Sequence, residues 1–214
     1  MTVAVALDRF VSGFAASALA TWVGLEPWQL TSQAQAIVRS MLAGLDPSAY
    51  AIDAEVAVHR TAVIESGATL KGPLVVGPGC FIASGAYLRG GNWMARDCSL
   101  GPGVELKSSF LFEGTRLAHF NFVGDSILGA DVNLEAGSIV CNHRNEREDK
   151  DILVRIEGRL HATGSPKFGA VIGDHGRVGA NAVLAPGTLL APRTVVQRAS
   201  LMDQEMPDPT GNAR

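Results

Sequence analysis

The sequence predicts a mainly β protein whose central part is a parallel β-helix, and two observations predict it. Apolar or small residues recur at every sixth position, a period that fits neither an α-helix nor a simple amphipathic strand. Gly-Pro-Gly triplets at 77–79 and 101–103 stand between the apolar positions, where a chain that turns needs them. In a parallel β-helix each hexad supplies one short strand and a corner.

The six-residue period sets the expected inward-facing residues. The first block comprises Val58, Ile64, Leu70, Val76, Ile82, Leu88, Met94, Leu100, Leu106, Phe112 and Ala118. We expect the phase to slip by two at Phe122 and then to run through Leu128, Leu134 and Val140. The period returns as Ile172, Val178, Leu184, Leu190 and Val196. Cys80 and Cys98 lie eighteen residues apart, so we expect them to stack inside the solenoid on adjacent coils.

Residues 1–50 lack the period and are predicted to form a helical cap. The stretch from Glu26 to Leu45 has Pro27 near its start, where proline suits the first helical turn, and apolar residues at helical spacing. Asp46-Pro47 ends the pattern. We expect this helix to pack across the first coil, because helical caps close the exposed ends of solenoids.

The rest of the chain divides at one long break in the period. Residues 51–200 are predicted to form the β-helix, interrupted by an excursion at 142–168 that is rich in charge and too long for a corner. Long loops in compact domains are commonly functional, and the stretch from Ile152 to Ile156 suggests a strand within this one. Residues 201–214 are polar at their end and are predicted to be a flexible tail.

Bulk properties exclude several classes of function. The net charge of −3 argues against non-specific nucleic-acid binding, and no run of eighteen apolar residues indicates a membrane span. Three cysteines are an odd and sparse set, which suits a reducing, cytoplasmic environment. The N-terminus resembles mature protein rather than a signal peptide, because Asp8 and Arg9 interrupt its apolar residues.

One string within the β-helix carries a functional resemblance. From Arg116 to Asn142 the sequence is RLAHFNFVGDSILGADVNLEAGSIVCN, and a KFGA string follows at 167–170. Together they resemble the left-handed β-helix hexapeptide-repeat acyltransferases. The similarity is greatest to the glucosamine-1-phosphate N-acetyltransferase half of the bifunctional enzyme that makes UDP-N-acetylglucosamine, and to stand-alone sugar-phosphate acetyltransferases. The similarity runs without gaps over 89–142 and resumes over 167–196.

The resemblance implies a homotrimeric N-acetyltransferase that uses acetyl-CoA and needs no metal. His119 matches the catalytic histidine of the family, and Asn142 matches a residue that orients the amine or the histidine. An amine that attacks a thioester must lose a proton, and an imidazole is suited to take it near neutral pH. Ala136 and Ala180 match the tracts where the coenzyme's pantetheine arm lies.

The resemblance also implies a binding site for a sugar phosphate. Arg89 and Lys107 match residues that hold the phosphate, and Asn133 matches a sugar-binding residue. The spacing of Arg89 and Lys107 supports the match independently. They stand eighteen residues apart, so they stack on adjacent coils at roughly 4.8 Å, and two cations so close call for an anion between them.

Three positions depart from the family pattern around the sugar. The family's substrate-contacting tyrosine is Phe122 here, and a second tyrosine is His143. Lys150 is the nearest match to a lysine of the loop, with Arg147 as the second choice. The nucleotidyltransferase half of the bifunctional enzyme has no counterpart, because residues 1–50 are too few for it.

Three alternatives stay open. One is a catalytically silent binding or assembly module, which loss of the tyrosine hydroxyl favours. Another is an acyltransferase of the same fold that acts on a nucleotide sugar, including the lipid-linked variant in which an acyl carrier protein donates a long acyl chain to it. A third is a metal-dependent carbonic anhydrase, which requires converging histidines that His59, His119, His143, His161 and His175 do not provide at the needed spacing.

Overall fold

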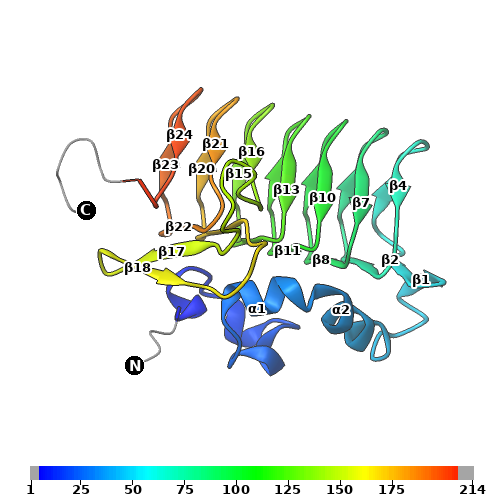
Figure 1. The fold of residues 1–214 in the computed structure, drawn as a ribbon. Helices are drawn as coiled ribbons and strands as arrows, with labels where there is room; N and C mark the ends of the chain where they lie inside the picture. The colour runs from blue at the N-terminus through cyan, green and yellow to red at the C-terminus, as the bar shows by residue number, and fades with distance from the viewer. Residues whose placement is uncertain (1–4, 207–214) are drawn as a thin grey trace.

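The computed structural model describes residues 5–206, which form a left-handed parallel β-helix with a helical segment along one side (Figure 1). Each coil contributes one strand to each of three sheets, which we call the first, second and third faces, and all neighbouring strands in them are parallel except β1, which pairs antiparallel with β2. The predicted fold class is therefore confirmed. No helix in the described range is long and apolar enough to cross a membrane.

The three faces follow one another around every coil. The first face holds β1 (Tyr50–Asp53), β2 (Val56–His59), β5 (Leu74–Val76), β8 (Asn92–Met94), β11 (Phe110–Leu111), β14 (Ile127–Leu128), β19 (Ala170–Ile172) and β22 (Thr188–Leu190). The second holds β3 (Val63–Ile64), β6 (Phe81–Ile82), β9 (Ser99–Leu100), β12 (Arg116–Leu117), β15 (Asn133–Leu134), β20 (Arg177–Val178) and β23 (Val195–Val196). The third holds β4 (Thr69–Leu70), β7 (Tyr87–Arg89), β10 (Glu105–Lys107), β13 (Phe122–Gly124), β16 (Ile139–Val140), β21 (Val183–Leu184) and β24 (Leu201–Met202).

The predicted inward column is confirmed as far as Leu106. Its members from Val76 onward are buried in one continuous core, and each stands opposite its counterpart on the next coil, as Leu88 does to Leu106. Cys80 and Cys98 lie in the same core, each 1% exposed, so their predicted stacking inside the solenoid is also confirmed.

The predicted phase is wrong over the next coil and confirmed again from Leu128 to Val196, whose predicted members all lie in the same core. The inward residues are Leu111, Leu117 and Val123, which stand opposite Met94, Leu100 and Leu106. Phe112, Ala118 and Phe122 are therefore each one position out of phase. The chain skips one residue before Leu111 and another before Leu128, where the sequence analysis placed a single slip of two.

Both skipped positions fall at the corner between the third and first faces. Ser108 and Asp125 turn the backbone there with φ of 47° each. The shortened corner is held by a ladder of polar side chains: Asn92 accepts the Ser109 backbone N–H at 3.0 Å, and the Ser109 hydroxyl accepts the Ser126 backbone N–H at 3.1 Å. These side chains replace backbone hydrogen bonds that a shorter corner leaves unmade.

The N-terminal segment is helical, as predicted, but it lies along the first face. It comprises the 3-10 helices η1 (Leu7–Arg9), η2 (Phe14–Ala16) and η3 (Ala20–Trp22) and the α-helices α1 (Pro27–Ser32) and α2 (Ala34–Leu42). Pro27 stands in the first turn of α1, and a break at Gln33 divides the expected single helix in two. Figure 1 shows α1 and α2 beside several coils rather than across the end, and α2 contacts β5 and β8.

This placement gives the first face an apolar exterior. Outward residues of successive first-face strands join a second core with the N-terminal segment: Ala57, Val75, Phe110, Ile127, Val171 and Leu189. Phe112, which the sequence analysis placed inside the solenoid, belongs to this second core. Its ring centroid lies 6.3 Å from that of Phe14 and 5.3 Å from that of Trp93.

The excursion leaves the solenoid after β16 and contains an antiparallel hairpin. Its strands are β17 (Leu153–Ile156) and β18 (Arg159–Ala162), so the strand suggested at Ile152–Ile156 is present. Of the tail predicted from residue 201, the described part begins with β24 and continues into contacts with the excursion. Residues 207–214 lie outside the described range.

Candidate functional site

Lys107, Asp125 and Asn142 form a polar chain where the third-face strands end. The Lys107 ammonium donates to both carboxylate oxygens of Asp125, at 2.8 and 2.6 Å, and the Asn142 side-chain amide donates to the same carboxylate. The side chains of Lys107 and Asp125 are 16% and 6% exposed. One buried carboxylate therefore holds two residues that the sequence analysis assigned to different tasks.

Arg89 stands beside Lys107 with a carboxylate of its own. The two residues are register partners on β7 and β10, as their spacing predicts. The Arg89 guanidinium donates twice to one oxygen of Glu105, at 2.9 and 2.6 Å. Two stacked cations repel each other unless anions lie nearby. The chain itself supplies these anions, with Glu105 beside Arg89 and Asp125 beside Lys107.

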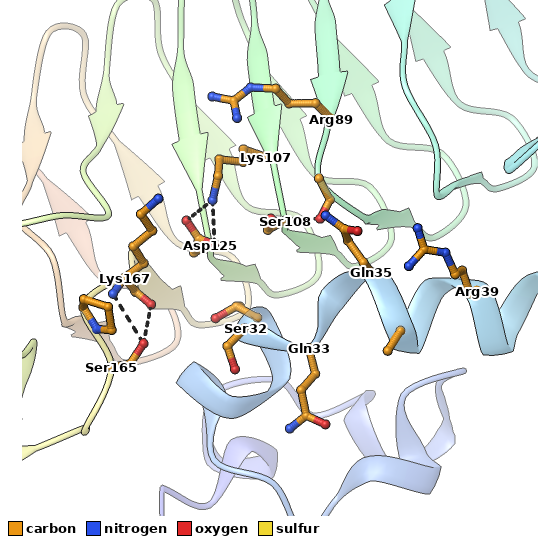
Figure 2. Close-up of a pocket in the computed structure, with 14 residues that line it drawn as sticks. Ser32, Gln33, Gln35, Arg39, Arg89, Lys107, Ser108, Asp125, Ser165 and Lys167 are labelled. Carbon is orange, nitrogen blue, oxygen red and sulfur yellow. Dashed lines mark hydrogen bonds and ion pairs between the residues drawn. The ribbon is translucent and has the colours of Figure 1, made fainter.

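A pocket of about 690 Å³, which we call the Lys107 pocket, opens over these cations (Figure 2). The solenoid contributes Arg89, Lys107 and Asp125 to it. The helical segment contributes Ser32, Gln35 and Arg39, among others, and the excursion contributes residues 165–167. The candidate phosphate residues therefore line a pocket whose other two walls come from the parts of the chain outside the repeat.

His119 lies on a different edge, at the corner between the second and third faces. Its side chain is exposed, and its ring lies edge-on to that of Phe120 with centroids 6.3 Å apart. Its backbone oxygen accepts the N–H of Gly137 on the next coil, and the oxygen of Ala136 accepts that of Asn181, which follows Ala180. His119, Ala136 and Ala180 thus follow one another along a single edge, which we call the His119 edge.

The two groups of candidates stand at opposite ends of the third-face strands. The His119 edge precedes β13, whereas Asp125 directly follows it. Within the described residues no hydrogen bond joins His119 to Asn142, the pair that the family resemblance places around one amine. A single chain therefore keeps the two groups of candidates apart, and we call them the two candidate half-sites.

Phe122 lies between these half-sites, on β13. It stands opposite Glu105 in register, and its ring extends towards Gly124, where an added Cβ would lie 2.8 Å from the tip of the ring and 2.6 Å from the Asn142 amide nitrogen. Asn133 lies on the second face instead, paired with Arg116 on β12 and Arg177 on β20. The chain does not bring Asn133 to the Lys107 pocket.

His143 and Lys150 both bind the backbone of the excursion. The His143 ring nitrogen Nδ1 is 3.0 Å from the Pro166 carbonyl oxygen. The Lys150 ammonium donates to the carbonyls of Arg144 and Asn145, at 2.9 and 3.2 Å, and to that of Arg147. Lys150 thus closes a turn of the excursion on itself and does not line the pocket.

Two acidic residues of the site were not among the sequence candidates. Glu105 precedes Lys107 by two positions on one strand, and residues two apart on a strand share a face. The sequence spacing could therefore have placed Glu105 beside the cations. Asp125 ends the AHFNFVGD string, where only His119 and Phe122 were singled out. Its partnership with Asn142 depends on the shortened corner, which the period did not reveal.

Comparison with known proteins finds sequence relatives, although no family model matches the chain. The bifunctional sugar-1-phosphate nucleotidylyltransferase/acetyltransferase of Sulfurisphaera tokodaii is 31% identical over 155 residues, which cover 72% of this chain and 38% of that protein. The bifunctional protein GlmU of Methanococcus vannielii is 32% identical over 126 residues, covering 59% and 30%. The chain thus spans well under half the length of these relatives.

Among solved structures, the acetyltransferase domain of PglB from Neisseria gonorrhoeae, in complex with acetyl coenzyme A, is similar to this chain with a TM-score of 0.39. It is 10% identical, and the match covers 86% of this chain and 72% of that one.

Proposed function

This chain is a hexapeptide-repeat β-helix protein related to the bifunctional sugar-1-phosphate nucleotidylyltransferase/acetyltransferases, and from that premise we propose its activity. It is an acyl-CoA-dependent N-acetyltransferase that acts on an amino-sugar phosphate such as glucosamine 1-phosphate. Acetyl-CoA is the donor, and the transfer requires no metal. The relatives' names supply the reaction class, the family resemblance supplies the candidate residues, and the pocket over Arg89 and Lys107 supports the phosphate-binding part of the proposal.

The observation that carries the proposal is the cationic pocket beside Asn142. Arginine and lysine are the usual ligands of phosphate, and Arg89 and Lys107 stand side by side at its floor. Asp125 holds the Lys107 ammonium in place before substrate binds. A phosphate dianion that enters the pocket competes with this carboxylate for the Lys107 ammonium.

His119 is the general base in this proposal. Its ring is exposed and has no side-chain hydrogen-bond partner among residues 5–206, so it is free to accept a proton from the acceptor's amine. The amine nitrogen attacks the thioester carbonyl carbon, a C–N bond forms, and the tetrahedral intermediate expels the CoA thiolate as the C–S bond breaks. The thiolate then takes the proton that His119 removed. Backbone N–H groups at the corners of the His119 edge stabilise the oxyanion.

Ala136 and Ala180 place the coenzyme on the same edge. As alanines they offer backbone and little bulk, which suits a flexible pantetheine arm. Since the His119 edge and the Lys107 pocket lie at opposite ends of the third-face strands, we propose that the active site forms between neighbouring copies in a homotrimer, with Asn142 and His119 supplied by different chains. Phe122, Asn133 and His143 then face the sugar.

One observation favours a second candidate. Phe122 lacks the hydroxyl of the family's substrate-contacting tyrosine, so a catalytically silent binding module on the same fold is the alternative.

Release of thiol from acetyl-CoA by the purified protein tests the proposal. Glucosamine 1-phosphate, galactosamine 1-phosphate and unphosphorylated glucosamine serve as acceptors. We expect release that depends on the 1-phosphate. Release that is equal with and without the phosphate would remove Arg89 and Lys107 from their role. No release with any acceptor, from folded protein, would favour the silent module or a nucleotide sugar as acceptor.

A further inference from the structure

Phe120 has a backbone conformation that is unusual for an aromatic residue. It follows His119 at the corner between the second and third faces, and its φ of 53° lies in the left-handed region. Residues with a Cβ rarely adopt this region, because the Cβ then approaches a backbone carbonyl oxygen, and bulky residues are outliers there. The corner is therefore strained at Phe120.

The neighbouring coils have glycine at this position. The Phe120 N–H donates to the Pro102 carbonyl at 3.1 Å. On the next coil, the Gly137 N–H donates to the His119 carbonyl at 2.9 Å. Gly103, Phe120 and Gly137 therefore occupy the same position on three successive coils, and both glycines have a φ of 69°. Glycine adopts this conformation without strain, so the local preference alone does not explain a phenylalanine here.

Packing within the chain does not offset the strain at Phe120. The residue is 70% exposed, so its ring contributes little to either core. One part of the ring lies against Gly103, where an added Cβ would come within 2.5 Å of Cδ1 and 2.7 Å of Cε1. Strain that the fold itself does not require is typical of functional sites.

The Phe120 ring also lies against the imidazole of His119. The two ring planes meet at 78° and their centroids are 6.3 Å apart, within the range in which edge-to-face aromatic pairs attract each other. The imidazole makes no hydrogen bond within residues 5–206, so no polar contact in that range fixes its orientation. The edge-to-face contact with Phe120 is the interaction that can fix it.

We infer that Phe120 is a positioning residue, which holds the His119 imidazole in the orientation that accepts the proton. The inference rests on the proposed function, because it takes His119 to be the general base. The strained backbone places the phenyl ring beside the imidazole, and the contact restricts rotation of the imidazole about its side-chain bonds. General-base catalysis benefits from this restriction, because the base must stay within hydrogen-bond reach of the proton that it removes.

Three substitutions of Phe120 test the inference. Phe120→Leu keeps an apolar side chain and removes the ring, Phe120→Tyr keeps the ring, and Phe120→Gly removes the ring together with the strain. Ala54→Gly is the matched control for strain, because Ala54 has a φ of 49° in the turn between β1 and β2, far from the His119 edge along the solenoid. We measure the kinetics of acetyl transfer, unfolding in urea and the oligomeric state by sedimentation.

We expect Phe120→Leu and Phe120→Gly to lower kcat at least about tenfold, because a misplaced base transfers the proton slowly. The KM values for acetyl-CoA and the acceptor stay within threefold, and Phe120→Tyr retains most of the kcat. Phe120→Gly and Ala54→Gly unfold at the same or a higher urea concentration than the unaltered protein, since glycine relieves the strain. Addition of Phe120→Leu to His119→Ala causes no further loss, because Phe120 acts through His119.

The NMR signal of the His119 Cε1–H group provides a readout that needs no turnover. The signal is assigned by its absence from His119→Ala. The ring current of a neighbouring phenyl group displaces it, so we expect it to move in Phe120→Leu and to stay in Phe120→Tyr. The signal of His161, which lies on β18, serves as the control and does not move.

A kcat that survives Phe120→Leu would overturn the inference, and so would a raised KM at unchanged kcat or a further loss in the His119→Ala background. Dissociation of the oligomer in Phe120→Leu would assign the ring to packing between copies and overturn it too, as would a His119 signal that this variant leaves in place. A signal that moves as expected in a protein without acetyl transfer would uphold the placement of the imidazole and contradict the proposed reaction instead. The NMR and kinetic measurements therefore fail separately.

Discussion

At the scale of single residues, Asp125 connects several parts of the candidate site. Its carboxylate holds Lys107 and Asn142, and its backbone oxygen accepts the N–H of Gly169. The same residue makes the shortened corner with a φ of 47°. A change at Lys107 therefore acts in two ways: it removes a phosphate ligand, and it leaves a buried carboxylate without a cation.

Lys107→Met separates these two effects when it is compared with the double variant Lys107→Met/Asp125→Asn. The single variant should raise the KM for the phosphorylated acceptor at least about tenfold. Its free energy of unfolding in urea should fall by roughly 3 kcal/mol, because breaking a buried ion pair strands one charge. The double variant should regain stability but not the low KM. A KM that rises equally for acetyl-CoA would mean that the phosphate binds elsewhere.

His119→Ala should behave differently, because the ring is exposed and its removal strands no partner within the described residues. We expect kcat to fall at least ~100-fold, the contribution of a general base, with no change in the urea unfolding curve. His161→Ala, in the hairpin strand β18, controls for loss of an imidazole. Unchanged turnover in His119→Ala would remove this residue from the reaction.

At the scale of elements, the excursion is fastened to the last coil by buried charges. The Arg144 guanidinium, 7% exposed, donates to both oxygens of Asp203 at 2.8 and 2.7 Å and lies 3.2 Å from Glu205. Arg147 reaches Glu205 as well, at 2.5 Å. We call this cluster the Arg144 clasp. It holds the strand pair β17–β18 beside β22 and so supports the excursion wall of the Lys107 pocket.

The Arg144 clasp should weaken in acid. Hydrogen bonding from Arg144 lowers the pKa of Asp203 below its ordinary value of 3.8. Because the pKa is lower in the folded state, the clasp contributes fully above the unfolded pKa and is lost as the pH falls through the folded one. We expect the free energy of unfolding to fall more steeply from about pH 5 to about pH 3 in the unaltered protein than in Arg144→Met.

Urea unfolding curves over that pH range measure this difference, with Arg159→Met as the exposed control. Parallel pH dependences in the unaltered protein and Arg144→Met would show that the Arg144 clasp does not couple to folding.

The sequence predicted the excursion and its strand, but not what covers the solenoid. The hexads from Val76 to Leu106 predicted the inward column correctly. On the second and third faces the inward residues are apolar, and the neighbouring outward residues differ from them in polarity. On the first face they do not: Phe110, Leu111 and Phe112 are all apolar, since the N-terminal segment covers the outside. An apolar residue stands at either phase there, so the skip of one residue before Leu111 left no trace in the pattern, and this is why Phe112 was misplaced.

At the scale of the whole molecule, the repeat predicts a rod with apolar side chains on its outer faces, which other elements or other chains must bury. The N-terminal segment covers the first face alone. Exposed apolar side chains remain on or beside the other two faces, as Val63 and Val195 on the second and Leu201 on the third show. The proposed trimer would bury these faces against neighbouring copies, and the same packing would bring the His119 edge of one chain to the Lys107 pocket of the next.

Mixed oligomers test whether the active site is shared. His119→Ala and Lys107→Met subunits, each nearly inactive alone at low acceptor concentration, are refolded together with different affinity tags. If each site takes His119 from one chain and Lys107 from its neighbour, random mixing leaves about a quarter of the sites intact, and thiol release should recover to that extent. Mixing His119→Ala with the double variant His119→Ala/Lys107→Met provides the control, since no arrangement of those chains makes a complete site. Doubly tagged oligomers that recover no activity would show that His119 and Lys107 act from one chain. In that case a movement within the chain would have to bring the two residues together, because they lie at opposite ends of the third-face strands.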